Sequence, residues 1–350
     1  MKAIQYDKFK GPLTVVEVPD PKPSVDGAVI EVKATGLCKS DWHGWQGHDA
    51  DICCFPHIPG HEFSGVIVEV GKSVKNIHVG DRVTVPFVCG CGECEQCCLG
   101  MHHICDNQTQ PGFTHWGSFA NYVEVFHADT NVVRLPDGID FVSAATLGCR
   151  FTTAYRAVMS QGKIRQGEWI SIYGCGGVGL SAVVVAAFAG ANIIAIDIDD
   201  TKLNVARSLG AHNVINATLE VDVAEAIIEL SNGGTHLSID AVGNRRVLVD
   251  SIRSLRKSGK HVQVGLFSNE EKNQVVPLDL VVSKELELIG SHGIQASKFA
   301  EIFDVIKSQE GVLHNIVAAT ISINEVGYHL PMMDTYNDKS AGVIVIDRFD

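Results

Sequence analysis

The chain has 350 residues, of which 45% are hydrophobic and 20% charged, a composition typical of a globular protein with about two domains. Its formal net charge of -13 argues against nucleic acid or an anionic membrane as a partner. The N-terminal residues lack the apolar core and cleavage site of a signal peptide, so the 11 cysteines favour a reducing compartment, and we expect a cytoplasmic protein.

The first 150 residues are rich in glycine, proline and short β-branched runs. Segments 28–36, 62–71 and 81–88 predict strands, because each is apolar and bounded by turn residues. Helical periodicity is scarce in this region. We therefore expect residues 1–150 to form a mostly β domain.

Four cysteines within this region have the spacing C-x2-C-x2-C-x7-C, namely Cys91, Cys94, Cys97 and Cys105. Four thiolates at such spacing close a tetrahedron around Zn²⁺ and leave no position for a substrate, so a structural zinc lobe is predicted over about residues 89–106. Cys89 and Cys98 are spare thiols beside the four. Cys98 competes with Cys97 for the third position, and the even two-residue gap favours Cys97.

Beyond residue 150, short apolar strands alternate with helical segments, which is typical of a doubly wound parallel sheet in an α/β fold. The expected strands are 169–174, 192–197, 212–216, 237–243, 261–267 and 286–291, and the expected helices are 151–164, 178–189, 200–210 and 219–232. The run 169–196 has no charge and is long enough for a membrane span, but its glycine-rich breaks favour a buried strand–helix–strand unit. A helix at 297–309 and a strand at 341–347 are expected near the C-terminus.

A glycine-rich turn follows the first of these strands and precedes a helix. Its glycines are Gly174, Gly176, Gly177 and Gly179 in the pattern G-x-G-G-x-G. Such a turn lets the backbone approach a pyrophosphate at a helix N-terminus. Asp197 ends the next strand, where a carboxylate binds the ribose hydroxyls and repels a 2′-phosphate, so we expect NAD rather than NADP. The alternative is a glycine-rich turn of an unrelated α/β protein with Asp197 as a strand-end cap.

Three further residues suggest a second metal site. Cys38, His61 and Cys149 each have an ordinary explanation as buried core residues when they are taken singly. Together they supply the Cys, His and Cys ligands of a catalytic zinc that keeps a fourth position open.

These motifs, taken in order, resemble the medium-chain zinc-dependent alcohol dehydrogenases. The resemblance rests on GLCKSDWHG, GHEFSG, the four-cysteine lobe, GCRFTTAY and the GCGGVG–Asp197 unit. It implies a GroES-like catalytic domain of residues 1–150 and 291–350 and a Rossmann NAD-binding domain of residues 151–290. It also implies two Zn²⁺ per chain, one catalytic and one structural, and a homodimer or homotetramer.

The same resemblance assigns roles to individual residues. The catalytic zinc ligands would be Cys38, His61 and Cys149, with the Glu62 carboxylate able to approach the metal. A proton relay would run through Ser40 and His43. Cofactor contacts are implied at Val178, Lys202, Val242, Val264 and Gly265. Arg150 departs from the family, where small residues are common at its position, and either alters the pocket or points away.

The expected reaction is the reversible oxidation of a primary or secondary alcohol to an aldehyde or ketone, with hydride transfer to NAD from an alkoxide on zinc. Cys149 favours simple alcohols, because the polyol branch of the family often has a carboxylate there. The aromatic residues Trp42, Trp45, Phe87 and Trp116 either line an apolar substrate pocket or serve packing. The alternatives are a polyol or threonine-type dehydrogenase and, in another class, a non-enzymatic zinc- and dinucleotide-binding protein.

Overall fold

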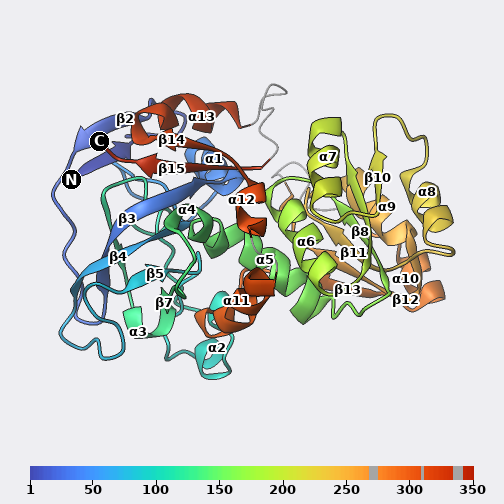
Figure 1. Cartoon of the computed structure of the whole chain (residues 1–350), viewed down its shortest axis with the longest axis horizontal. Helices are drawn as coiled ribbons and strands as arrows, with labels where there is room; N and C mark the ends of the chain where they lie inside the picture. Colours follow the sequence, from blue (N-terminus) through green and yellow to red (C-terminus); the bar gives the residue numbers. More distant parts are fainter. Residues whose placement is uncertain (268–274, 309–310, 334–341) are drawn as a thin grey trace. The chain divides into compact units, whose positions relative to one another are not determined.

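The computed structural model describes residues 1–267, 275–308, 311–333 and 342–350, which form two compact units (Figure 1). The first unit contains Met1–Thr152, Gly293–Phe303 and Val317–Asp350, and the second contains Thr153–His292 and Asp304–Ile316. The segment Asp304–Ile316 thus belongs to the second unit, whereas we expected it in the first. Residues 309 and 341, at the ends of two expected elements, lie outside the described residues.

The first unit is built on a mostly antiparallel sheet. Its described strands, in spatial order, are β14 (Val317–Ser322), β15 (Val343–Arg348), β3 (Ala28–Leu37), β4 (Phe63–Val70), β5 (Arg82–Thr84) and β7 (Val133–Arg134), with β6 (Tyr122–Val125) also paired to β3. A separate hairpin joins β1 (Lys2–Gln5) and β2 (Thr14–Glu17). The sheet buries a core that includes Ile30, Phe63, Ile67 and Val83, which explains the β-branched runs of this region.

Helices of the first unit are short. They are α1 (Lys39–Gln46), α2 (Glu95–Cys98), η1 (His102–Ile104), α3 (Ala128–Asn131), α4 (Phe141–Ala144), η2 (Leu147–Phe151), η5 (Ala296–Lys298), η6 (Ile323–Glu325) and α13 (Val326–Met332). Helix α1 begins directly after β3, where the Asp41 carboxylate accepts a hydrogen bond of 2.9 Å from the backbone N–H of Cys38. It ends at Gly47, whose φ of 82° lies in the left-handed region that favours glycine.

The second unit contains a parallel sheet of six described strands. Their order is β10 (Asn213–Asn216), β9 (Asn192–Asp197), β8 (Trp169–Tyr173), β11 (Thr235–Asp240), β12 (Leu255–Gln263) and β13 (Glu287–Gly290). The helices are η3 (Arg156–Gln161), α6 (Gly177–Phe188), α7 (Asp200–Ser208), α8 (Val223–Leu230), α9 (Arg245–Arg253), α10 (Leu278–Lys284) and α12 (Val312–Ile316). Helices α5 (Thr152–Tyr155) and α11 (Phe299–Ser308) run across the boundary of the two units. The strand order reverses at β8, so the expected doubly wound Rossmann architecture is confirmed.

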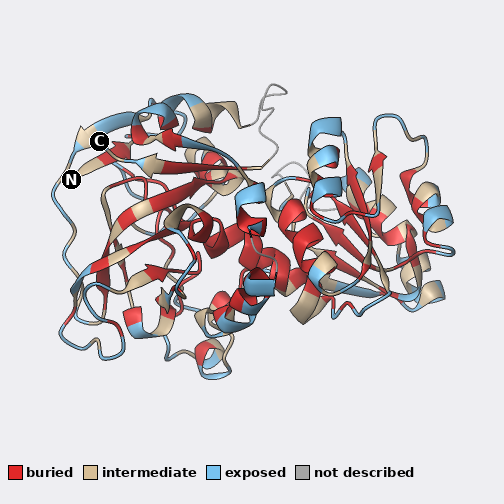
Figure 2. Ribbon diagram, in the orientation of Figure 1, coloured by how far each residue is buried: buried red, intermediate tan, exposed pale blue. Residues whose placement is uncertain are grey.

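The central strands of this sheet are buried along nearly their whole length. Figure 2 shows β8 and β11 in red, and four of the five residues of β8 are buried. Parallel strands that are covered on both faces have continuous apolar sequences. The uncharged segment 169–196 therefore corresponds to β8, α6 and β9. Across the described residues, no helix has the length and apolar character needed to cross a membrane.

Candidate metal centres and nucleotide pocket

The first candidate metal centre gathers three residues from three separate elements of the first unit. Cys38 is the N-cap of α1, His61 directly precedes Glu62 and β4, and Cys149 lies in the π-helical turn η2. Their ligand atoms all lie within 4.8 Å of one another, and all three residues are buried. The structure therefore brings together the three residues that the sequence singled out separately.

Asp41 orients the imidazole of His61 toward this group. The His61 Nδ1–H donates a hydrogen bond of 2.8 Å to Asp41 Oδ1, which also accepts one of 3.1 Å from the backbone N–H of Gly60. The proton on Nδ1 leaves a lone pair on Nε2, and this buried nitrogen has no hydrogen-bond partner among the described residues. An unpaired imidazole nitrogen beside two thiols is the donor set that Zn²⁺ prefers. The sequence reasoning missed Asp41, although its position three residues after Cys38 is a capping signal.

Glu62 is held by Arg150 rather than joined to the three ligand atoms. The Arg150 guanidinium forms an ion pair with Glu62 Oε2 and donates a hydrogen bond of 2.8 Å to the carbonyl oxygen of Leu37. Glu62 Oε1 accepts the backbone N–H groups of Cys149 and Arg150 at 3.2 and 3.0 Å. The side chain of Arg150 thus points toward the Glu62 carboxylate beside the metal centre. Although an arginine departs from the family pattern at this position, it has a defined role here as the ion-pair partner of Glu62.

Aromatic rings form the apolar wall of this centre. Phe87 belongs to a buried cluster with Cys38 and Cys149, and its ring centroid lies 6.2 Å from that of His61. Phe113, which the sequence reasoning did not select, lies 5.3 Å from the same ring. Trp42 packs in a different core cluster, with Trp45 against it. Trp116 is 37% exposed and donates to the carbonyl oxygen of Pro56.

Helix α1 carries both residues of the expected relay. The hydroxyl oxygen of Ser40 lies 3.8 Å from the sulfur of Cys38. His43 follows three positions later, and its Nδ1 lies 3.0 Å from Nδ1 of His48, a residue that the sequence reasoning did not select. The hydroxyl group is thus beside a candidate ligand, and the imidazole of His43 is next to a second imidazole.

The second candidate metal centre is the four-cysteine lobe. The sulfur atoms of Cys91, Cys94, Cys97 and Cys105 lie within 4.8 Å of one another. The Sγ atoms of Cys94 and Cys105 are 3.6 Å apart and those of Cys91 and Cys97 are 4.0 Å apart. A tetrahedron with Zn–S bonds of about 2.3 Å has sulfur atoms about 3.8 Å apart, so the four thiols fit zinc.

The neighbouring cysteines lie outside this group. Cys98 is exposed and its sulfur faces the carbonyl oxygen of Glu93 at 3.5 Å, whereas Cys97 is buried within the cluster. Cys89 is buried near the carbonyl oxygen of Pro86, and burial raises the pKa of its thiol to about 12.

Backbone N–H groups of the lobe point at the sulfur atoms. The N–H of Cys97 faces Cys94 Sγ at 3.5 Å, and the N–H of Asn107 faces Cys105 Sγ at 3.3 Å. The hydrogen bond from Cys97 is the main cause that lowers the pKa of the Cys94 thiol to about 6. Cys94 therefore favours the thiolate form, which is the form that binds a metal. Burial instead raises the pKa of the Cys97 thiol to about 12 and also raises the pKa of Cys105.

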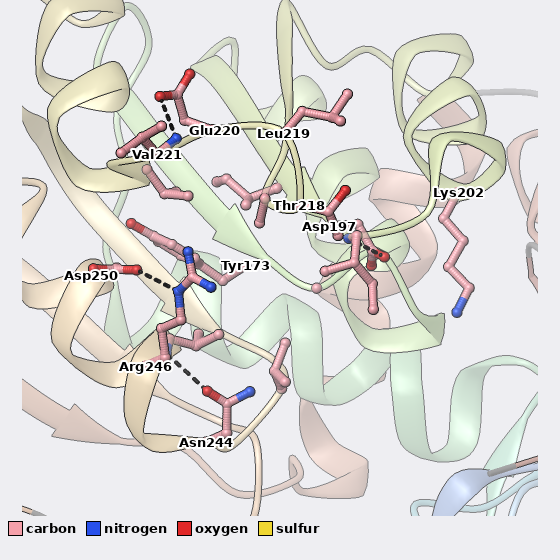
Figure 3. Close-up of a pocket in the computed structure, with 17 residues that line it drawn as sticks. Tyr173, Asp197, Lys202, Thr218, Leu219, Glu220, Val221, Asn244, Arg246 and Asp250 are labelled. Carbon is pink, nitrogen blue, oxygen red and sulfur yellow. Dashed lines mark hydrogen bonds and ion pairs between the residues drawn. The ribbon is translucent and has the colours of Figure 1, made fainter. Parts of the chain in front are cut away.

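A cavity of about 760 Å³ opens in the second unit at the carboxyl ends of β8 and β9 (Figure 3). This is where doubly wound sheets bind nucleotides. Gly174 lines the cavity with φ of 90°, and a Cβ at Gly179 would lie 1.7 Å from the carbonyl oxygen of Gly174. Only glycine at position 179 allows helix α6 to pack this closely on the turn.

Four of the predicted cofactor residues line this cavity, namely Gly174, Asp197, Lys202 and Val242. Gly176 is the N-cap of α6, and Gly177, Val178 and Gly179 form its first turn. A Cβ at Gly265 would lie 2.3 Å from the backbone nitrogen of Gly243, and Val264 donates its N–H to the carbonyl oxygen of Asp240. These last two residues thus pack beside the turn that follows β11.

Further lining residues come from segments that the sequence reasoning did not connect with the nucleotide. They are Thr218, Glu220, Asn244, Arg246 and Asp250. Arg246 Nε lies 3.7 Å from Asp250 Oδ2. Figure 3 shows this pair on the opposite side of the cavity from Asp197 and Lys202. Turn signals after β10 and β11 mark these segments in the sequence, but only the sheet brings them together.

Comparison with known proteins agrees with this geometry. Residues 24–137 match the family described as alcohol dehydrogenase GroES-like domain, and residues 177–308 match the zinc-binding dehydrogenase family. An alcohol dehydrogenase of Geobacillus stearothermophilus is 37% identical over 292 residues, which cover 83% of this chain and 84% of that protein.

Two solved structures share the fold over nearly the whole chain. An alcohol dehydrogenase of Escherichia coli CFT073 complexed with NADH has a TM-score of 0.87 and 26% identity, with 99% of each chain covered. A zinc-binding dehydrogenase of Sinorhizobium meliloti 1021 bound to NADP has a TM-score of 0.87 and 27% identity, with 99% and 98% of the two chains covered.

The fold and these similarities define an oxidoreductase that acts on alcohols with a nicotinamide dinucleotide. More narrowly, the chain belongs to the medium-chain zinc-dependent alcohol dehydrogenases, as the sequence motifs indicated.

Proposed function

We propose that the protein is an NAD-dependent zinc alcohol dehydrogenase that interconverts simple primary or secondary alcohols with their aldehydes or ketones. The observation that supports this proposal most directly is the Cys38–His61–Cys149 group, whose ligand atoms lie within 4.8 Å of one another. Three donors leave one position of a tetrahedral zinc for a substrate oxygen, in contrast to the four-cysteine lobe. The lobe would hold a second, structural zinc.

Within this proposal, Cys38, His61 and Cys149 hold the catalytic zinc, and Asp41 fixes the His61 tautomer. When bound, Zn²⁺ supplies a Lewis acid for an alcohol oxygen and the dinucleotide supplies a hydride acceptor. Glu62 stays with Arg150 in the described arrangement and would approach the metal only after leaving that ion pair. Phe87 and Phe113 exclude water from the centre, which strengthens its electrostatic interactions.

Ser40 is proposed to accept the proton that the alcohol hydroxyl loses. Its oxygen lies 3.8 Å from Cys38 Sγ, so it is beside the position that a substrate oxygen would take. His43 would pass the proton on, and its contact with His48 extends the chain of imidazoles by one residue.

Asp197 is proposed to select NAD over NADP. Its Oδ2 accepts the Cys175 N–H at 2.6 Å, and its Oδ1 accepts the N–H groups of Ile198 and Asp199 at 2.7 and 3.0 Å. These bonds hold a charged carboxylate at the edge of the cavity. A 2′-phosphate about 4 Å away would be repelled by about 4 kcal/mol per charge pair at an effective dielectric of about 20.

A substrate screen tests the proposed function. Turnover of ethanol, longer alcohols, benzyl alcohol, sorbitol and threonine would be followed by NADH or NADPH absorbance. We expect the simple alcohols to be the best substrates and kcat/KM with NAD to exceed that with NADP at least about tenfold, equivalent to about 1.4 kcal/mol. A preference for sorbitol or threonine, or equal efficiency with both dinucleotides, would contradict the respective part of the proposal.

The substitution Ser40→Ala tests the relay. We expect kcat to fall about 10²–10⁴-fold, because the hydroxyl proton loses its acceptor, while zinc content and NAD affinity stay unchanged. The exposed Ser73, replaced by alanine, is the matched control. Unchanged turnover in Ser40→Ala would remove the relay from the mechanism.

A further inference from the structure

Two adjacent cysteines of the first unit belong to neither metal centre. Cys53 and Cys54 are both exposed, and their sulfur atoms lie 3.5 Å apart. We propose that Cys53 and Cys54 form a surface dithiol that a peroxide oxidises to a disulfide, and that this closure alters the packing of helix α1. The inference concerns modification of the enzyme and does not depend on which alcohol is the substrate.

The chemistry needs one peroxide molecule for each dithiol. The peroxide is hydrogen peroxide. The thiolate of one cysteine attacks a peroxide oxygen, the O–O bond breaks, and the leaving hydroxide takes up the proton that the thiol lost, so a sulfenic acid and one water result. The second thiol then attacks the sulfenic sulfur, the S–O bond breaks, and a disulfide and a second water form. The two thiols are oxidised, and the peroxide is reduced to water.

The two sulfur atoms must approach each other for this step. A disulfide bond is about 2.05 Å long, so the distance between the sulfur atoms must shorten by about 1.5 Å from 3.5 Å. Adjacent Cα atoms are about 3.8 Å apart, below the usual range of about 4.4–6.8 Å for a disulfide. The bond therefore requires a backbone adjustment, and its strain makes it easy to reduce, which suits a reversible modification.

The residues on either side of the dithiol are anchored by packing. The ring of Phe55 lies edge-on to the rings of Phe9 and Tyr6, with centroid distances of 5.0 and 5.8 Å. Ile52 is buried on the other side, only 5% exposed. Phe55 is 39% exposed, so Ile52 is the buried neighbour to which a backbone adjustment at the dithiol is passed on.

Ile52 connects the dithiol to helix α1. A Cβ added at Gly44, within α1, would lie 2.7 Å from Ile52 Cδ1 and 3.5 Å from the ring of Phe113. Phe113 in turn packs against the His61 imidazole at 5.3 Å. A shift of Ile52 therefore reaches the helix that carries Ser40 and His43, and also the aromatic wall of the metal centre.

The other cysteines outside the metal centres differ from this pair. Cys89 and Cys175 are buried, which keeps both thiols out of reach of a peroxide in solution. Cys98 is exposed, and its sulfur faces the carbonyl oxygen of Glu93. Cys98 therefore provides a matched single-thiol control.

Peroxide titration of the zinc-loaded enzyme tests the proposal. The readouts are peptide mass, zinc content, and KM for the best alcohol, each before and after dithiothreitol. In the wild type we expect the peptide that contains Cys53 and Cys54 to lose two hydrogen atoms and KM to change at least about twofold. Zinc content is expected to stay constant, and dithiothreitol is expected to reverse both changes.

Variants separate this effect from oxidation elsewhere. Cys53→Ser/Cys54→Ser is expected to keep the basal activity and to show no peroxide-dependent change in KM, whereas Cys98→Ser is expected to respond like the wild type. Phenylarsine oxide, which bridges paired thiols, is expected to bind one equivalent more in the wild type than in the double variant. Absence of the disulfide peptide, or the same change in KM in the double variant, would overturn the proposal. A disulfide that forms without a change in KM would overturn the coupling to α1.

Discussion

The ionisable side chains buried around the Cys38–His61–Cys149 group occur in two pairs. Asp41 accepts the His61 Nδ1–H at 2.8 Å, and Glu62 is paired with Arg150, whose side chain is 7% exposed. A charge in such a place is costly unless it is paired and hydrogen-bonded. Because each group has such a partner, charged side chains can be buried beside this metal centre.

Removal of one member of the second pair should destabilise the protein strongly. We expect Arg150→Met to lower the free energy of unfolding by about 3–5 kcal/mol, because the Glu62 carboxylate is left buried without its counterion. Urea denaturation of the zinc-loaded protein measures this effect. Glu62→Gln/Arg150→Met should recover part of the loss, since both charges are then absent.

The exposed ion pair between Arg134 and Asp81 is the matched control. Its N···O distance is 2.7 Å, and the Arg134 side chain is 50% exposed. Arg134→Met should therefore cost no more than about 1 kcal/mol. Equal losses in Arg134→Met and Arg150→Met would contradict the assignment of Arg150 as the partner of a buried charge.

At the scale of elements, the four-cysteine lobe depends on its thiols for its shape. Its helix α2 has 4 residues and η1 has 3, both too short to be stable alone. The four sulfur atoms converge between these short elements. A bound metal would thus supply the stability that regular secondary structure does not.

Replacement of Cys97 and of Cys98 should have different effects. Cys97→Ser is expected to remove one zinc per chain and to lower the melting temperature, because Cys97 Sγ belongs to the tetrahedral group. Cys98→Ser is expected to keep the zinc content and stability of the wild type. Elemental analysis and thermal denaturation measure both quantities. Loss of zinc in Cys98→Ser alone would reverse the assignment.

Strand β12 contains a buried histidine whose proton content should couple to stability. His261 Nε2–H donates to Gln263 Oε1 at 3.1 Å, and Nδ1 accepts from the Ser251 hydroxyl at 2.8 Å. Burial lowers the pKa of His261 below its ordinary value of 6.5. The folded protein therefore favours the neutral form of the His261 ring.

This shift has a definite sign in a pH experiment. Between the lowered pKa of folded His261 and about 6.5, the unfolded chain binds more protons than the folded chain does. The free energy of unfolding therefore falls as the pH falls, by at most about 1.4 kcal/mol per pH unit. His261→Asn should lose this contribution, and its stability relative to the wild type should improve from about pH 7.5 to about pH 5.5. Urea denaturation at both pH values with saturating zinc measures the difference. A difference that does not depend on pH would contradict the prediction.

At the scale of the whole molecule, the metal centres and the nucleotide cavity belong to different units. Both candidate metal centres consist of residues of the first unit, and the residues that line the nucleotide cavity belong to the second. Each part is thus built from residues of a single unit. Loss of metal in one unit should therefore leave the cavity of the other intact.

A chelator tests this separation. Dialysis against a strong zinc chelator is expected to abolish alcohol oxidation. The affinity for NADH, measured by fluorescence, is expected to change less than about twofold. This change is smaller than the change of about fivefold that weak coupling between two sites produces. Zinc added back should restore turnover. Loss of NADH binding together with zinc would show that the two units depend on each other.

Some motifs and elements were easier to predict from the sequence than others. The glycine turn at Gly174 and the four-cysteine lobe are local patterns, so spacing alone predicts them. Most strands of the parallel sheet were also predicted, because buried parallel strands form short apolar runs. The helices α9 and α10 were not predicted, and η3 is π-helical where part of an ordinary helix, 151–164, was expected. Helix α9 is clearly amphipathic, with Leu248 and Ile252 buried on one face, so its pattern was present in the sequence and was missed. The local backbone geometry that makes a turn π-helical leaves little trace in the sequence.

By itself, the sequence determined the family, the α/β class and the identity of the cysteine and histidine residues in both candidate centres, because those depend on residue type and spacing. The tertiary structure decided which distant side chains become partners. Asp41 beside His61, Glu62 beside Arg150, Phe113 beside the metal centre and Arg246 in the nucleotide cavity all depend on contacts across the fold. Such contacts are set by how strands pair and helices pack, which no local spacing encodes.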